Sequence, residues 1–254
     1  MRPVKKECVG ETIKLFESVG DMETTDHIIQ VEYKPYQNAR KVLLANLGNY
    51  CSYCEGYYAN GSDLQTEHIQ PKGLKDDSGR LLYDHLQYKW SNFLLGCATC
   101  NGKGNKGTKD VRFEDVHLPH LNNTFLSLEY REAGVVVVNP NLVGLSKQNA
   151  TNLIQLVGLD KPSSETDYRC DVRRQTWDKA QKLLKQYQGG EVLLDKLVAY
   201  IKEQPCWSIW YTVFSGYDEV RQKLLEFPGT CKECFDENNH YNPINRNPGK
   251  KDPI

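Results

Sequence analysis

The sequence predicts an α+β protein in which a cysteine-bearing core lies between an N-terminal helical segment and a helical C-terminal half. Three observations predict this. Two Cys-x-x-Cys pairs enclose residues 55–96, short apolar runs typical of strands lie near them, and apolar residues recur at helical spacing after residue 146. We expect three zones, at residues 1–49, 50–115 (the core) and 116–254 (a β-hairpin followed by helices).

The composition limits the class of protein. Hydrophobic residues make up 39% and charged residues 26% of the 254 residues, which is an ordinary globular balance. No apolar run approaches the roughly 18–20 residues that a membrane span requires, and Met1–Lys6 lacks the apolar core of a signal peptide, so we expect a cytoplasmic protein. The net charge of −1 argues against a broadly basic surface. Nucleic-acid binding would therefore need a local basic patch.

The first half contains one clear helix and two candidate strands. Residues 36–47 carry an apolar stripe and stop at Gly48, which is typical of a helix and its terminator. Residues 63–69 are expected to form a strand, and residues 87–95 a second strand or the approach to a helix.

In the second half, residues 125–130 and 135–138 predict a β-hairpin around Gly134. Ser146 is expected to cap a helix that runs through Leu156. Further helices are expected over residues 166–188, 193–202 and 207–227, and a mobile tail from Asp236 onward.

The nine cysteines indicate metal binding more than disulfides, because their number is odd and six of them lie in Cys-x-x-Cys pairs. Cys51 and Cys54, together with Cys97 and Cys100, can place four thiolates tetrahedrally around one zinc ion. The alternative is two unrelated turns with buried cysteines.

The remaining cysteines are less informative. Cys231 and Cys234 are expected to form a helix-end turn with free thiols, or a second metal site, for which His240 and Cys206 are conceivable further ligands. A redox pair is a third alternative. Single cysteines such as Cys8, Cys170 and Cys206 are most simply small core residues.

The candidate catalytic and metal-binding residues lie between the two cysteine pairs and directly after them. Glu67-His68-Ile69-Gln70-Pro71 precedes Trp90-Ser91-Asn92-Phe93-Leu94-Leu95, and Cys97-Ala98-Thr99-Cys100-Asn101 follows. This series resembles the HNH endonuclease family, whose core is the ββα-metal fold. The alternative for Glu67-His68 is an ordinary surface pair. His85, His117 and His120 lie outside the motif and are expected to be structural or surface residues.

The resemblance implies a role for each motif residue. His68 would be the general base that activates water, since neutral imidazole suits that task near pH 7. Glu67 and Asn101 would hold Mg²⁺ or a similar divalent cation through oxygen atoms, and Asn92 would fix the loop that carries His68. The chain departs from the commonest pattern by having Glu67 in place of Asp and Asn101 in place of a final His.

Further phrases resemble one subfamily, the PtuB-type HNH proteins of the Septu antiphage system and of some retrons. These phrases are Met1-Arg2-Pro3-Val4, Tyr50-Cys51-Ser52-Tyr53-Cys54-Glu55, residues 67–72 and residues 90–97. The subfamily implies a role in bacterial antiphage defence and a complex with a PtuA-type ABC ATPase.

A short basic segment follows Asn101, in which only Asp110 offsets the positive charges of Lys103, Lys106, Lys109 and Arg112. It would attract phosphates without reading bases, although a solvated loop is the alternative. A DNA endonuclease is the favoured function. A toxin-like ribonuclease and a non-catalytic, zinc-dependent nucleic-acid-binding module stay open.

Two regions are candidates for docking the ATPase. The C-terminal helices carry large aromatic residues, of the kinds enriched at interfaces: Trp177, Trp207, Trp210, Tyr211 and Phe214. The alternative is that these residues fill the core. Residues 1–30 are polar enough to form a docking arm instead.

Overall fold

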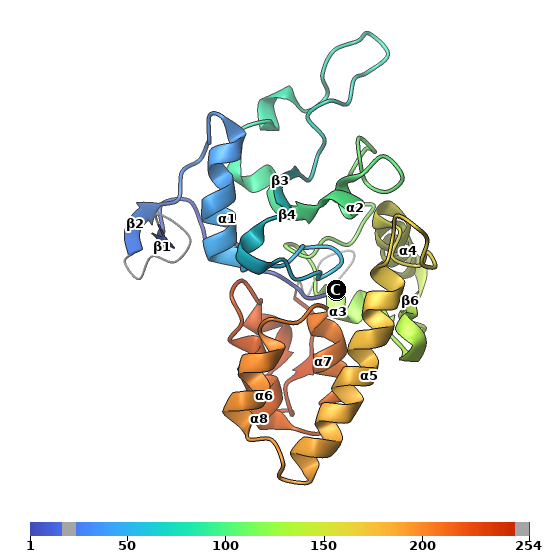
Figure 1. Ribbon diagram of the computed structural model, residues 1–254. Helices are drawn as coiled ribbons and strands as arrows, with labels where there is room; N and C mark the ends of the chain where they lie inside the picture. The colour runs from blue at the N-terminus through green and yellow to red at the C-terminus, as the bar shows by residue number, and fades with distance from the viewer. Residues whose placement is uncertain (17–23, 247–253) are drawn as a thin grey trace.

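The computed structural model describes residues 1–16, 24–246 and 254, and its elements form an upper and a lower region (Figure 1). The strands are β1 (Thr12–Phe16), β2 (Thr24–Ile28), β3 (Leu64–His68), β4 (Phe93–Cys97), β5 (Leu128–Tyr130), β6 (Val136–Val138), β7 (Phe235–Asp236) and β8 (Asn242–Pro243). The helices are α1 (Ala39–Leu47), α2 (Ala98–Asn101), α3 (Thr124–Ser127), α4 (Gly144–Val157), α5 (Arg169–Gln188), α6 (Leu194–Ile201), α7 (Trp207–Val213) and α8 (Asp218–Leu225). The model is therefore mixed helix and small sheet, as the α+β prediction states.

The upper region is built on the antiparallel pair β3–β4, which leads directly into α2. Glu67 lies opposite Leu94 and His68 opposite Phe93 in this pair. Helix α1 packs against both strands through Val42, Leu43 and other buried residues. It ends at Gly48, whose φ of 76° is favourable for glycine and costly for other residues, so the predicted helix and its terminator are confirmed.

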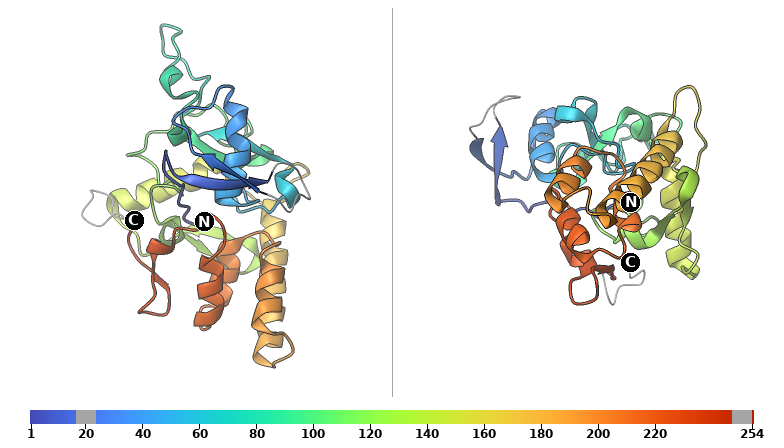
Figure 2. Two further views of the ribbon diagram at one scale, coloured as in Figure 1. Left: turned by 90° about the vertical axis from the view of Figure 1, so that its left-hand side faces the viewer. Right: turned by 60° about the horizontal axis from the view of Figure 1, so that its bottom comes forward.

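The N-terminal segment differs from the expected helical one. Strands β1 and β2 form an antiparallel hairpin that stands off to one side of the body (Figure 2). Alternating burial along β1 marks it as a strand with one face toward the protein. Part of the proposed docking arm, residues 17–23, lies outside the described residues.

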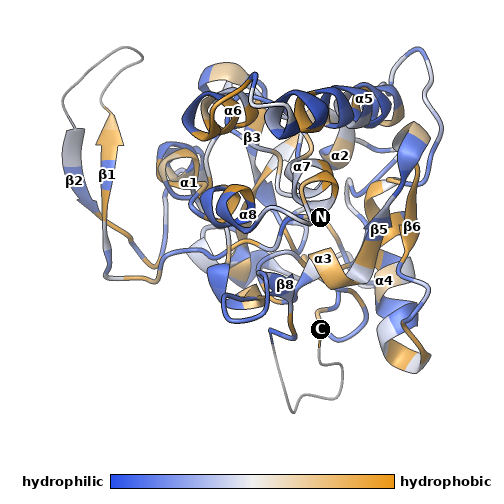
Figure 3. Ribbon diagram, turned by 90° about the horizontal axis from the view of Figure 1, so that it is seen from below, coloured by the Kyte–Doolittle hydropathy of each residue, from blue (hydrophilic) through white to orange (hydrophobic). Residues whose placement is uncertain are grey.

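The lower region consists of α5 to α8, and a view from below shows hydrophilic residues predominating along α5 (Figure 3). Helix α7 is almost wholly buried: Trp207, Trp210 and Tyr211 are each at most 1% exposed, and Phe214 follows with 0%. Each ring packs on other aromatic rings: Trp207 and Tyr211 on each other and on Phe235, Trp210 on Tyr200, and Phe214 on Tyr187 and Tyr217. They therefore fill the core and do not form an exposed docking surface. Trp177 is partly buried against the same cluster.

Several local predictions are wrong. Helix α4 begins at Gly144, so Ser146 lies inside it and makes no cap. Residues 207–227 form two helices, because the chain turns after Val213 and restarts at Asp218. Within the expected mobile tail, residues 236–246 are held: β8 pairs with β7, and the Asn123 side chain donates hydrogen bonds to the carbonyls of Cys234 and Ile244 (both 2.8 Å). Residues 247–253 of that tail lie outside the described residues. The predicted hairpin is confirmed as β5–β6.

A buried carboxylate joins the two regions. Glu55, which is 2% exposed, accepts hydrogen bonds from the backbone N–H of Arg2 and from both the backbone N–H (2.8 Å) and hydroxyl (2.6 Å) of Ser208. Glu55 also has a left-handed φ of 60°, a conformation that costs on the order of 1 kcal/mol and persists only where the surroundings enforce it. No described helix is both long and apolar enough to cross a membrane.

Replacing Glu55 by alanine should destabilise the protein by on the order of 3 kcal/mol, because several buried donors lose their acceptor at once. Urea unfolding followed by far-UV circular dichroism measures the effect, with the exposed Glu203→Ala as control. Equal stability of the two variants would show that Glu55 does not join the regions.

Candidate metal centre and the adjoining cleft

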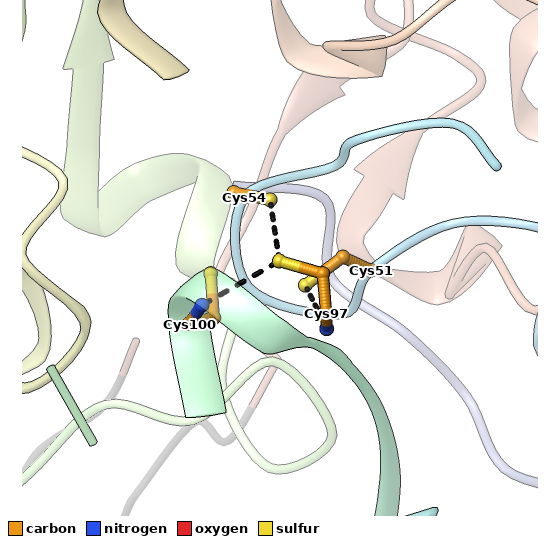
Figure 4. Close-up of side chains that lie close together, drawn as sticks. All are labelled: Cys51, Cys54, Cys97 and Cys100. Atoms are coloured by element: carbon orange, nitrogen blue, oxygen red, sulfur yellow. Dashed lines mark hydrogen bonds between the residues drawn. The ribbon is translucent and has the colours of Figure 1, made fainter. Parts of the chain in front are cut away.

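Four cysteines converge where the turn after α1 meets the end of β4 (Figure 4). Cys51 and Cys54 come from that turn, Cys97 is the last residue of β4, and Cys100 lies in α2. All four side chains are buried, and their sulfur atoms lie within 4.8 Å of one another. The backbone N–H of Cys97 points at the Cys51 sulfur (3.4 Å), and that of Cys100 at the Cys97 sulfur (3.5 Å).

This geometry suits a tetrahedral zinc ion. Zinc–sulfur bonds of about 2.3 Å place the sulfurs of a tetrahedron roughly 3.8 Å apart. The distance between the Cys54 and Cys97 sulfurs is 3.7 Å. Hydrogen bonds to Cys100 and to Cys51 raise the pKa of the Cys54 thiol, since buried thiolates crowd one another unless a cation offsets their charge. The four cysteines could therefore hold one zinc ion.

Arg169, which sequence reasoning missed, connects the cysteine cluster to α5. Its Nη1 lies 3.3 Å from the Cys100 sulfur and donates to the Val157 carbonyl (2.7 Å), while its Nη2 bonds the carboxylate of Asp167 (2.7 Å). A guanidinium beside a thiolate offsets part of the negative charge that four thiolates would leave around a divalent ion. No local pattern could have identified Arg169, because its partner lies 69 residues away in sequence.

The other cysteines show no comparable arrangement among the described residues. Cys231 and Cys234 are buried, and they lie at the start and the end of a 3-10 turn over Lys232–Cys234, not at a helix end. His240 is exposed and bonds Asp218 (2.8 Å), so it is not a ligand to them. Of the single cysteines, Cys206 is buried as expected, whereas Cys8 is exposed and Cys170 is half-buried.

His68 lies at the end of β3 beside a cleft and is 7% exposed. Its Nε2 lies 2.9 Å from the Gln87 carbonyl, and because a carbonyl only accepts hydrogen bonds, Nε2 carries the hydrogen of the neutral ring. The lone pair is then on Nδ1. The rings of Tyr36 and Phe93 pack edge-on against the imidazole, at 4.7 and 5.1 Å between centroids.

Burial, aided by the charges of Lys72 and Lys106 and opposed by the hydrogen bond to Gln87, lowers the pKa of His68 to about 4. The imidazole is thus neutral at pH 7. The imidazole binds a proton more readily in the unfolded state than in the folded one. The contribution of His68 to the free energy of unfolding therefore decreases as the pH falls from about 6.5 to about 4.

Asn92 fixes the chain immediately after His68. Its Oδ1 accepts from the Gln70 N–H (2.8 Å), and its Nδ2 donates to the Gln70 carbonyl (2.9 Å) and to the Leu86 carbonyl (3.3 Å). Leu86 directly precedes Gln87, whose carbonyl holds His68. The 2% exposed Asn92 therefore joins both chain segments that orient the imidazole.

Glu67 is 2% exposed and forms an ion pair with Lys106, with 2.5 Å between Oε1 and Nζ. The Lys106 side chain is itself 1% exposed, so it does not offer its ammonium to a nucleic-acid backbone as the sequence predicted.

Asn101 lies in α2 with its Nδ2 donating to Gln65 Oε1 (3.3 Å), and it lines the same cleft as Glu67. The Asn105 side chain donates to the Thr99 carbonyl and accepts from Lys161 Nζ.

The cleft beside His68 has a volume of about 910 Å³. One wall comes from the start of α1 and residues 71–73, the other from residues 101–109. Its lining includes one carboxylate, Glu67, and five cationic side chains: Arg40, Lys72, Lys103, Lys106 and Lys109. Arg40 and Lys72 were not predicted, because they lie far from the basic segment in sequence. Arg112 lies outside this lining and pairs with Asp110 (3.2 Å).

The histidines outside the motif lie apart from the cleft lining. His117 is fully buried, with its Nδ1 2.9 Å from the Ser127 hydroxyl. Burial holds the pKa of His120 well below its usual value. His85 is exposed.

Comparison with known proteins gives one informative similarity. The chain is 27% identical over 147 residues to "Retron Vc95 putative HNH endonuclease" of Vibrio cholerae serotype O1 biovar El Tor, which covers 55% of this chain and 67% of the relative. No family model matches the chain. The similarity supports the resemblance to HNH endonucleases that the motif residues indicate.

Purified protein should contain one zinc ion per chain, and Cys97→Ser should lose it together with much of the folding free energy, because structural zinc contributes roughly 10–16 kcal/mol in small zinc-binding peptides. Elemental analysis and thermal unfolding measure both effects. The exposed Cys8→Ser should retain zinc and stability. Fully folded wild-type protein without zinc would contradict the assignment.

Proposed function

We propose that this protein is a metal-dependent HNH endonuclease of the PtuB type that hydrolyses DNA phosphodiester bonds. The observation that carries the proposal is His68, held through Nε2 by the Gln87 carbonyl, in a cleft lined by five cationic side chains. The antiparallel pair β3–β4 followed by α2 agrees with a ββα-metal core. The similarity to the Vibrio cholerae protein supports the same reading.

His68 would act as the general base through Nδ1. A neutral imidazole can take a proton from a water molecule, and the negative charge of a bound phosphate raises its basicity from the low value of the free protein. Asn92 would keep the ring oriented through both of the segments it bonds. Lys72, Lys103 and Lys109 would attract the phosphate backbone without reading its sequence.

Glu67 and Asn101 are the residues proposed to hold Mg²⁺ or a similar ion. Mg²⁺ prefers oxygen donors. The ion pair with Lys106 uses Oε1 of Glu67, so Oε2 is the oxygen proposed to bind the metal ion. A bound divalent cation supplies charge stabilisation for the phosphate and the leaving oxygen.

His68→Ala should lower the rate of plasmid cleavage in Mg²⁺ by about 10²–10⁴-fold, the usual effect of losing a general base. The exposed His85→Ala should cleave at the wild-type rate. Plasmid DNA and transfer RNA are assayed in parallel. Cleavage of RNA alone indicates a ribonuclease, and binding without cleavage indicates a non-catalytic module.

We further propose that the protein is the effector of an antiphage complex with a PtuA-type ABC ATPase. A nuclease whose cleft lysines can attract phosphates but do not read bases has little means of sparing the host chromosome, so control by a partner is reasonable. With the aromatic residues of α7 buried, the hairpin β1–β2 is the better docking candidate, because Phe16 and Ile28 are 59% and 62% exposed.

Co-expression with a PtuA-type ABC ATPase should give one complex in size-exclusion chromatography. The double variant Phe16→Ser/Ile28→Ser should weaken it without changing the zinc content. A nuclease that elutes alone across salt and nucleotide conditions would contradict the complex. A complex unaffected by the double variant would contradict the docking site.

A further inference from the structure

Lys106 contacts two consecutive residues of β3 with one ammonium group. Its Nζ forms the ion pair with Glu67 Oε1 (2.5 Å) and donates a hydrogen bond to the His68 carbonyl (2.7 Å). With 1% of its side chain exposed, this lysine ranks among the largest fully buried side chains of the protein. A lysine is rarely buried to this degree unless a partner offsets its charge.

The segment that carries Lys106 is itself firmly held. The Lys106 backbone N–H donates to the Cys100 carbonyl (3.1 Å), and the neighbouring Asn105 side chain donates to the Thr99 carbonyl (2.7 Å). Both acceptors lie in α2, the helix that contains Asn101. Lys106 therefore connects α2 to β3, the two elements that carry the proposed metal and base residues.

Lys106 also gives Glu67 a fixed orientation. A buried carboxylate is stabilised only by groups that offset its charge, and Lys106 is the cation paired with Glu67 among the described residues. Partners that hold a metal-ligating carboxylate or histidine reduce the reorganisation needed for binding, and their loss typically weakens metal affinity by about 10–100-fold.

We propose that Lys106 is a positioning residue of the nuclease site, which orients the Glu67 carboxylate for a divalent cation and fixes the strand end that carries His68. This rests on the function proposed above. Lys106 thus differs from its neighbours Lys103 and Lys109, which are exposed and can meet a phosphate directly.

The test compares Lys106→Met with Lys103→Met in full-length, zinc-loaded protein. Binding of Mn²⁺ is measured by electron paramagnetic resonance, and plasmid cleavage gives kcat and KM. Lys106→Met should weaken Mn²⁺ binding by about 10–100-fold and lower kcat, with little change in KM for DNA. Lys103→Met should raise KM and leave Mn²⁺ affinity unchanged.

Two results would overturn the inference. Wild-type Mn²⁺ affinity with a raised KM for DNA would make Lys106 a nucleic-acid contact, and tighter Mn²⁺ binding would make it a competitor of the metal.

If Lys106→Met does not fold, Lys106→Gln gives the same test, because its amide can still donate to the His68 carbonyl. A folded glutamine variant with wild-type Mn²⁺ affinity would overturn the inference equally.

Failure of this inference can be distinguished from failure of the proposed function. Wild-type protein that neither binds Mn²⁺ nor cleaves nucleic acid contradicts the proposed function, and the inference fails with it. Wild-type protein that does both, beside an unaffected Lys106→Met, contradicts the inference alone.

Discussion

The short turn between Cys51 and Glu55 determines where the other parts of the molecule lie. Cys51 and Cys54 direct their sulfurs toward the end of β4 and α2, whereas Glu55 directs its carboxylate toward Arg2 and α7. The backbone of Ser52 donates to the Leu95 carbonyl (2.8 Å), which fixes the turn to β4. Strand β3 pairs with β4, so the positions of Glu67 and His68 follow from this turn as well.

The elements predicted correctly are those whose signals are local. Gly48 at a left-handed φ ends α1, Gly134 closes the hairpin β5–β6, and Gly189-Gly190 follows the end of α5. The cysteine cluster belongs to the same group, because the spacing within each Cys-x-x-Cys pair already places two sulfurs together. For such features, the chemistry of a few neighbouring residues is sufficient.

The parts that sequence reasoning missed depend on partners far apart in the chain. The sequence around Lys106 is typical of a basic surface loop. Its ammonium nevertheless lies in the interior, where it pairs with the Glu67 carboxylate and donates to the His68 carbonyl. Arg169 likewise meets Cys100 only after the chain has folded. The roles of His68, Asn92 and Asn101 in catalysis stay predictions, since they depend on chemistry that the fold alone does not test.

The hydrogen bonds around Glu55 also affect the order in which the protein can be completed during synthesis. Ser208 is 153 residues beyond Glu55, and the Lys202 carbonyl that accepts from the Tyr50 hydroxyl is 152 residues beyond Tyr50. A ribosome adds about 5–20 residues per second, so these partners arrive roughly 8–30 s after the turn itself. During that interval the Glu55 carboxylate lacks the two donors of Ser208, and Tyr50 lacks the Lys202 carbonyl that accepts from its hydroxyl. Prematurely released chains that end before α7 therefore lack the hydrogen bonds that join the turn at Glu55 to the lower region.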